Sequence, residues 1–462
     1  MAVLALLAAV VGLDGADKAT ISVNARAIEH AFSINDAGIG LLVSVSSLTG
    51  ALFTLPVGVL TDRVTRVRLL GTSIALWALA SLASGLAPSF GWLMAARVAL
   101  GAVTATAGPT VASLFGDFFP AGERARLYGY VLAGELVGTG AGYVITSGIT
   151  ALTSWRFSLA WLTLPALALS AVVWRTPEPS RGRQETLTSG RERSKDRGKP
   201  SSQGPAGEAL PEAQDAAGHL AEESGVPVVR GQVLVEDPRR MSLWRVARYV
   251  LRIRTALLMI TASALGYFFF AGVRTFALLF ATRHYAISTG AASGLTLVVG
   301  TGALAGVFGG GRLADLLLRR GYLNGRVLVP SLALLLAPLA LAPAFITTSL
   351  WAAVPLLTLG AALLAAPNPP LDAARLDIVP PGLWGRAEAI RTAVRTLGEF
   401  LAPLLFGYLS ASVFTGADHL RDAFLLGLAP LAAAASLGFL ALWTYPRDVA
   451  TANASGPRRA SA

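Results

Sequence analysis

The sequence predicts an all-α membrane protein with twelve transmembrane helices in two pseudo-symmetric six-helix halves. Only 14% of its 462 residues are charged and 54% are hydrophobic, whereas about a quarter of the residues of an average soluble domain are charged. Apolar stretches of about 20 residues, the length that crosses a hydrocarbon core, follow one another along the chain. Because lipid offers the backbone no hydrogen-bond partners, these stretches must be helices.

The N-terminal half is predicted to cover residues 1–175. Its spans, separated by short polar breaks, are 3–28, 36–60, 68–89, 91–116, 126–150 and 155–174. The composition then changes, because residues 176–240 are rich in Pro, Gly, Ser, Glu and Arg and poor in aromatic residues. Such a segment cannot bury enough apolar surface to fold, so we expect a disordered cytoplasmic linker.

The C-terminal half is predicted to cover residues 254–445, before a cytoplasmic tail at 446–462. It is preceded by residues 241–253, "MSLWRVARYVLRI", in which three arginines fall on one helical face. We expect this segment to be an amphipathic helix that lies on the membrane surface. The six spans of this half are 254–282, 289–317, 325–346, 350–371, 387–414 and 421–443.

Basic residues gather in alternate loops, namely those after the second, fourth, eighth and tenth spans. The opposite loops are nearly free of Lys and Arg, with exceptions at Arg156, Arg283 and Arg421. Because Lys and Arg concentrate in cytoplasmic loops, both termini and the linker are expected in the cytoplasm. The excess of Arg over Lys suggests a bacterial chain, and therefore a multi-pass protein of the inner (plasma) membrane.

A charged motif marks an internal repeat. "GVLTDRVTR" matches "GRLADLLLR" at an offset of 253 residues, so that Asp62 and Arg66 correspond to Asp315 and Arg319. A second pair, "DFFPAGERAR" and "DIVPPGLWGR", repeats at an offset of 260. The two halves are therefore predicted to be related.

The first pair, "GVLTDRVTR" and "GRLADLLLR", resembles the loop motif of the major facilitator superfamily, and "RVALGAVTATAGPT" resembles its fourth-helix motif. The resemblance covers the chain except the linker, and it implies a secondary transporter whose halves rock around a site near the bilayer midplane. In that family the Asp and Arg of the motif form a charge relay that closes the cytoplasmic side. By match, Asp62 and Arg66 gate one half and Asp315 and Arg319 the other; the alternative is that these charges only fix topology.

Within the superfamily the chain is most similar to the spinster-like branch. "LDGADKATISV" resembles the first-helix pattern of that branch, with Asp17 on its acidic residue, and "SWRFSLAW" resembles its Trp-Arg-Phe stretch. The chain departs at Thr104, where the branch usually has Glu, and it lacks the Trp-x-Pro of the seventh helix. The resemblance implies proton coupling and a lysophospholipid- or sphingolipid-like cargo. The alternatives are a small organic acid or sugar phosphate, or drug–proton exchange.

Ionisable residues within the predicted spans are the candidate site residues, because such charges need a partner or a wet cavity. Asp17 and Glu135 are candidate proton carriers. Arg97 and Arg274 are candidates for holding an anionic group, since a guanidinium binds carboxylate or phosphate through two hydrogen bonds. The alternatives are a permanent Asp17 salt bridge, and pairing of these arginines with Asp14, Asp17 or Glu135.

Two further features lie in the tenth and eleventh spans. The stretch "AAPNPPLDAAR" contains three prolines, which have no backbone N–H to donate, so the helix of the tenth span must break there. Asn368 lies at this break and is a candidate substrate contact. Arg395 corresponds to Glu135 at the 260-residue offset, which suggests a gate between the halves. The alternative is that Arg395 only pairs with Glu399 one helical turn away.

Enzyme and cofactor functions find no support in the sequence. There is no cysteine for a thiol nucleophile or thiolate metal site, the four histidines lack metal spacing, and no Walker-type loop is present. The net charge of +11 is explained by topology, so nucleic acid is not an expected partner. We expect a monomer that binds protons and a small-molecule or lipid-like substrate and that contacts the lipid bilayer. A non-transporting scaffold or receptor is the remaining alternative, and the motifs in both halves argue against it.

Overall fold

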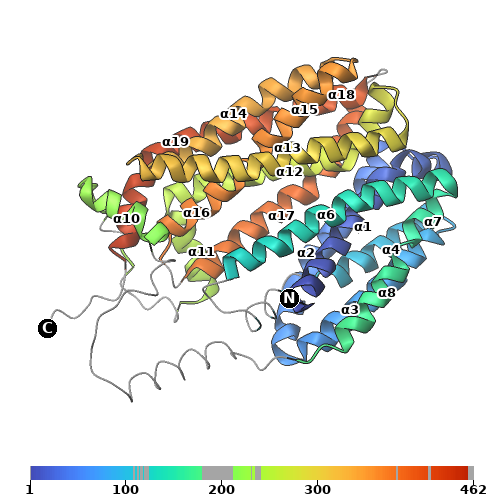
Figure 1. Ribbon diagram of the computed structural model, residues 1–462, viewed down its shortest axis with the longest axis horizontal. Coiled ribbons are helices and arrows are strands. Elements are labelled where there is room, and N and C mark those ends of the chain that lie inside the picture. The colour runs from blue at the N-terminus through green and yellow to red at the C-terminus, as the bar shows by residue number, and fades with distance from the viewer. Residues whose placement is uncertain are drawn as a thin grey trace. The chain divides into compact units, whose positions relative to one another are not determined.

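The computed structural model describes most of the chain as helices, and its described residues contain no strand (Figure 1). By contacts the chain divides into two compact units, Met1–Gly207 with Thr275–Thr296, and Glu208–Arg274 with Leu297–Ala462. The described residues are 2–107, 110–111, 114, 118, 124–178, 212–229, 232–234, 241–380, 383–414 and 418–455.

The first unit contains the helices of the predicted N-terminal half. They are α1 (Ala2–Phe32), α2 (Asp36–Arg63), α3 (Arg66–Gly85), α4 (Phe90–Thr104), α6 (Arg124–Leu152), α7 (Trp155–Ala160) and α8 (Thr163–Trp174). Three helices begin at polar N-cap residues whose side chains accept a backbone N–H: Asn35 from Gly38, Ser89 from Trp92 and Ser154 from Phe157. These caps satisfy donors that a helix start leaves unpaired, and they explain why α2, α4 and α7 start where they do.

The second unit contains most of the remaining helices. They are α10 (Glu212–Glu223), α11 (Leu243–Arg252), α12 (Arg254–His284), α13 (Thr289–Arg319), α14 (Gly325–Ile346), α15 (Leu350–Ala365), α16 (Asn368–Ile378), α17 (Trp384–Tyr408), the π-helical segment η5 (Leu409–Val413), α18 (His419–Gly427) and α19 (Ala429–Asn453). The last part of α12 and the first part of α13, Thr275–Thr296, belong to the first unit.

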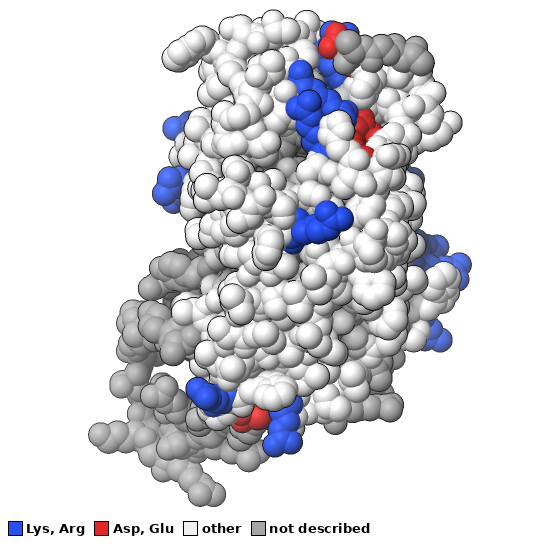
Figure 2. Space-filling view, turned by 90° about the vertical axis from the view of Figure 1, so that its right-hand side faces the viewer, with Lys and Arg blue, Asp and Glu red and all other residues white. Residues whose placement is uncertain are grey.

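A described helix lies at each of the twelve predicted spans, which confirms the predicted fold class. Within the described residues, nine helical stretches are long and apolar enough to cross a membrane. The first, fourth and fifth predicted spans are occupied by α1, by the shorter apolar helix α4, and by α6. Figure 2 shows one face on which most of the described surface is uncharged, as contact with lipid requires.

The break predicted in the tenth span is present. α15 ends at Ala365 and α16 begins at Asn368. Pro369 and Pro370 then fall in the first turn of α16, where backbone N–H groups have no acceptor within the helix. The prolines therefore separate two helices without leaving a hydrogen bond unmade inside either one.

Part of the segment predicted to be a disordered linker is helical. α10 packs beside α19 (Figure 1), and its Ala217 and Ala221 are buried in an apolar cluster. The backbone N–H groups of Val229 and Leu234 donate to the side chains of Thr451 and Ser455, which lie at and just after the end of α19. Composition missed this contact because a helix that buries alanines raises the hydropathy of its segment very little.

Glycines bring α1 and α6 into close contact in the first unit. A Cβ at Gly134 would lie 2.7 Å from the Ala8 carbonyl oxygen, one at Gly142 would lie 2.6 Å from Ala16 Cα, and one at Gly138 would overlap the Gly12 backbone. Small residues let helix backbones approach one another closely in a membrane. The close approach sets how near the charged residues of α1 and α6 lie.

Gly138→Val is therefore expected to lower the melting temperature of the purified protein strongly, because the new methyl groups meet backbone that cannot move aside. Overpacking typically costs about 1–3 kcal/mol, and backbone contact places this site at the upper end of that range. Gly148→Val is the matched control on the same helix, since a Cβ there meets nothing within 4 Å. Equal losses in both variants would contradict the close α1–α6 contact.

Candidate functional site

A buried ion pair joins α1 and α4 in the first unit. Asp17 is 5% exposed and Arg97 is 3% exposed, and Arg97 Nη1 donates to Asp17 Oδ2 over 3.1 Å. Arg97 Nη2 donates to Thr20 Oγ1 over 3.3 Å, and the Thr20 hydroxyl donates to the Asp17 carbonyl oxygen over 2.7 Å. The structure thus presents the alternative in which Arg97 pairs with Asp17, so each charge is neutralised where desolvation would otherwise be costly.

Both partners of this pair keep unused hydrogen-bonding capacity. Asp17 Oδ1 and Arg97 Nε are buried and have no hydrogen-bond partner among the described residues. A buried polar atom left unpaired costs about 1–3 kcal/mol, so the site is favourable for a proton on the carboxylate or an acceptor at the guanidinium. A structural salt bridge alone would not require either atom to remain open.

A second, more exposed cluster lies one turn away and links α1 to α6. Lys18 Nζ lies 2.6 Å from Asp14 Oδ2 and 3.8 Å from Glu135 Oε1. All three side chains are partly exposed. The two candidate proton carriers therefore occupy different surroundings: Asp17 is buried against an arginine, and Glu135 is half-exposed near a lysine.

Asn24 is a buried polar residue that the sequence analysis did not select. Its amide donates to the Thr20 carbonyl over 2.8 Å, and its Oδ1 accepts from Thr150 over 2.8 Å and from Ser158 over 3.0 Å. These bonds tie α1 to α6 and α7. The available signal was an amide inside an apolar span. It was missed because the candidates were chosen among ionisable residues.

A third ionic cluster at the ends of α1, α2 and α12 was also missed. Arg283 donates to Glu29 Oε2 over 2.6 Å and to Asp36 Oδ1 over 2.9 Å, and both acidic residues are buried. The Ser22 hydroxyl adds a hydrogen bond to the Thr275 carbonyl over 3.0 Å. The signal was Arg283 itself, a basic residue in a loop where the topology predicts none. These contacts hold the end of α12 in the first unit.

At the opposite end of the first unit, Arg66 binds a residue that the repeat did not indicate. Arg66 Nε donates to Glu178 Oε1 over 2.9 Å, and Glu178 also accepts the backbone N–H groups of Arg66 and Val67 at the start of α3. Burial alone would raise the pKa of the Glu178 carboxyl, but these hydrogen bonds lower it below its ordinary value. Asp62, the predicted partner of Arg66, has a side chain outside the described residues.

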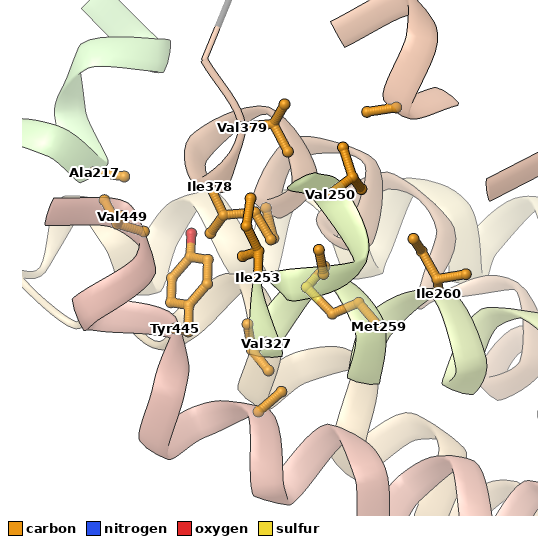
Figure 3. Packing of buried hydrophobic residues seen from close by; sticks show 14 of the residues in the cluster. Ala217, Val250, Ile253, Met259, Ile260, Val327, Ile378, Val379, Tyr445 and Val449 are labelled. Carbon is orange, nitrogen blue, oxygen red and sulfur yellow. The ribbon is translucent and has the colours of Figure 1, made fainter. Parts of the chain in front are cut away.

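The second unit contains a comparable contact at the start of α14. Arg326 Nη1 lies 2.7 Å from both carboxylate oxygens of Asp377, and the Tyr445 hydroxyl donates to Asp377 Oδ2 over 2.5 Å. Figure 3 shows the Tyr445 ring within the surrounding apolar cluster. Asp315 lies 3.9 Å from Arg326 at the edge of this group, and Arg319 is exposed.

These contacts correct the register of the repeat after the loop. The sequence offset pairs Arg66 with Arg319, but Arg66 begins α3 whereas Arg319 ends α13. Arg326, near the start of α14, has the position, the burial and the carboxylate partner that Arg66 has in the first unit. The loop between α13 and α14 is longer than the loop between α2 and α3. The offset of 253 residues therefore aligns the two halves only as far as the end of α13.

The remaining candidates lie in the second unit. Arg395 Nε lies 3.3 Å from Glu399 Oε1, and its guanidinium carbon lies 4.6 Å from the centre of the Tyr267 ring. Arg274 stacks over Phe270 at 5.6 Å, and Asn368 is partly buried at the start of α16. Arg395 thus pairs with Glu399 one helical turn away on α17.

The chain matches the model of the Major Facilitator Superfamily over residues 7–374, and it belongs to that family. Family and fold point to a multi-pass membrane transporter. Within the family, spinster proteins are among the curated relatives that the chain matches.

Its sequence is 34% identical over 168 residues to Protein spinster homolog 3 of Homo sapiens, covering 35% of this chain and 33% of that protein. Over 140 residues it is 28% identical to the Probable L-galactonate transporter of Escherichia coli, covering 30% and 31% of the two chains. These matches span about a third of each relative.

Solved structures are similar over nearly the whole chain. A bacterial homolog of the human lysosomal transporter Spinster, in an inward-facing and unoccupied conformation, aligns with a TM-score of 0.68 at 20% identity, covering 97% of this chain and 96% of that one. A D-xylose–proton symporter aligns with a TM-score of 0.67 at 16% identity, covering 95% and 96%. At these identities the likeness establishes the fold.

Glu178→Gln is expected to lower the melting temperature at neutral pH, because the amide cannot replace the carboxylate that holds Arg66 and the α3 start. The pKa of Glu178 is lower in the folded state, so its stabilisation is present above the ordinary Glu value of 4.5 and is lost as pH falls through the lowered pKa. The difference between wild type and variant should therefore shrink below pH 4.5. Glu222→Gln, at an exposed position of α10, is the control, and a pH-independent difference would contradict the contact.

Proposed function

We propose that the protein is a proton-coupled transporter of an amphiphilic organic anion, lysophospholipid- or sphingolipid-like in chemistry. The observation that carries this proposal is the buried Asp17–Arg97 pair, with one open atom on each partner. Arg97 is the anion-binding residue and Asp17 is the proton carrier. The cargo class is the one that the sequence resemblance to the spinster-like branch implies.

Charge balance couples the two events. In the pair the buried charges sum to zero, so the carboxylate or phosphate of a cargo adds an uncompensated negative charge unless a proton arrives with it. A cargo anion that takes over the Arg97 fork frees Asp17, whose desolvated carboxylate then favours its neutral, protonated form. Proton and anion therefore occupy the site together.

The same reasoning separates the proposal from drug–proton exchange. A lipophilic cation would bind the Asp17 carboxylate and displace its proton, so cation and proton would move in opposite directions. An anion would bind Arg97 and move with the proton. The direction of proton flow relative to cargo thus distinguishes the two classes.

The second unit supplies groups that fit an amphiphile. Arg274 lies over the Phe270 ring, which sets a cation beside an apolar surface, and Asn368 offers an amide at the break between α15 and α16. Within the second unit taken by itself, we propose Arg274 as a contact for an anionic group and Asn368 as a polar contact. Glu135, beside Lys18, is the alternative proton carrier.

The ionic clusters are proposed to act as gates. Arg66 with Glu178, and Arg326 with Asp377 and Asp315, close the cytoplasmic ends of the two units, together with Asp62 and Arg319 of the repeated motif. Arg283 with Glu29 and Asp36 closes the opposite side. A gating role is also proposed for the Arg395–Glu399 pair of α17. Positive-inside bias supports this orientation, with both termini in the cytoplasm of a bacterial cell.

A small hydrophilic anion is the second candidate cargo. The observation that favours it is the similarity to the Probable L-galactonate transporter of Escherichia coli. It uses the same Arg97 and Asp17 chemistry but does not need the aromatic surface beside Arg274.

Asp17→Asn is expected to abolish cargo-dependent proton movement into vesicles under an imposed pH gradient, because the amide cannot carry the proton. Anionic cargo should still bind, since Arg97 remains available. Glu135→Gln is the matched control and should retain coupled flux. Coupled flux in Asp17→Asn together with its loss in Glu135→Gln would transfer the proton role to Glu135.

Arg274→Ala is expected to weaken binding of an anionic lysophospholipid about tenfold or more, as loss of a charge-assisted hydrogen bond does, and to change binding of an uncharged analogue little. Arg156→Ala is the control, because Arg156 also stacks on an aromatic ring, Trp155, at 4.3 Å but lies at a span end. Equal losses for both ligands would assign Arg274 a structural role.

The cargo class is tested by challenging vesicles that contain the purified protein with lysophospholipids, small organic anions and lipophilic cations, and recording proton flux for each. The proposal expects flux with lysophospholipids in the direction of the cargo. Flux with small anions alone would select the second candidate, and proton movement opposite to a cation would select drug exchange.

A further inference from the structure

α11 is a short helix that immediately precedes a membrane-spanning helix. It runs from Leu243 to Arg252, its first turn is capped by the Ser242 side chain, and α12 begins at Arg254. Between them Ile253 has extended backbone angles, φ −70° and ψ 111°, so α11 does not continue the axis of α12. Because α12 enters the membrane here, α11 lies at the level of the membrane surface.

The two faces of α11 differ in chemistry. One face buries Val246 and Val250, with Ile253 following, in the apolar cluster of the second unit (Figure 3). The other face carries Arg245, Arg248 and Arg252 with Trp244, which is 79% exposed, and Leu251, which is 40% exposed. The helix contains no Asp or Glu. We call these five residues the outer face.

An open recess lies beside the outer face. It is lined by Gln232, Tyr249, Arg252 and Arg254, with Val229 and Ile253. The Tyr249 hydroxyl donates to the Gln232 carbonyl over 3.2 Å, and the Gln232 amide donates to the Arg252 carbonyl over 3.3 Å. These bonds fasten the chain segment before α11 to the helix, so the recess has defined walls with two arginines at its edge.

We propose that the outer face of α11 and this recess bind the headgroup of an anionic phospholipid of the adjoining leaflet. Guanidinium groups bind phosphate oxygens in pairs, and each basic residue near an anionic membrane surface adds to the attraction. A soluble phosphate would account for the arginines but not for Trp244 and Leu251. An exposed indole and leucine beside arginines fit the boundary between headgroups and acyl chains. This inference is independent of the transported cargo.

The test compares lipid binding to the full-length, purified protein by native mass spectrometry with phosphatidylglycerol and phosphatidylcholine. Arg248→Gln/Arg252→Gln removes two charges from the outer face and is expected to weaken phosphatidylglycerol binding roughly 10- to 30-fold, with phosphatidylcholine binding unchanged. Arg320→Gln/Arg447→Gln is the control, because it removes the same amount of charge from two exposed positions, one just after α13 and one in α19. It should leave the binding of both lipids unchanged. Melting temperatures of the two double variants report whether each is folded.

Two further arms identify the ligand. Trp244→Ala is expected to weaken phosphatidylglycerol binding, and glycerol 3-phosphate is expected not to compete with the lipid for the wild-type protein. Effective competition would assign the site to a soluble phosphate and overturn the proposal. Unchanged phosphatidylglycerol binding in the α11 double variant, or an equal loss in the control double variant, would also overturn it.

Discussion

The pairing of one buried carboxylate with one buried guanidinium is the constraint on which the proposed mechanism depends. Either Asp17 or Arg97 alone would be an isolated charge in an apolar bundle, and breaking such a buried pair typically costs about 3–5 kcal/mol. Together they are tolerated, and the fork of Arg97 is held by a second acceptor, Thr20. The pair is consequently stable at rest but can be opened by any ligand that supplies a replacement charge.

Helix packing places this pair and its neighbours. The glycines of α6 let α1 approach within backbone contact, which brings Glu135 toward Lys18, and Asn24 fixes α1 to α6 and α7 beyond that point. On α1, therefore, a few turns carry the buried pair, the exposed cluster and the amide network. A change in the packing of α1 against α4 or α6 would alter the contacts of all three groups. Proton binding to one of these groups is thereby coupled to movement of α1.

The fold could be predicted from sequence because its causes are local: hydropathy sets the spans, prolines set the break before Asn368, and the repeat sets the halves. The ionic candidates Asp17 and Arg97 were also visible, since charges inside spans are costly. Their pairing was only one of the alternatives, because sequence gives no distance between helices. Glu178 and the Glu29–Asp36–Arg283 cluster were missed because each joins residues far apart in the chain. α10 was missed because its contacts are made by alanines.

The most direct test of the central claim is the number of protons taken up when an anionic cargo binds to the purified protein, measured by calorimetry in buffers of different ionisation enthalpy. If Asp17 is protonated as the cargo takes over Arg97, binding near neutral pH should draw about one proton from the buffer per monoanion, as charge balance in a dry site requires. Binding that takes up no proton, or releases one, would contradict the account.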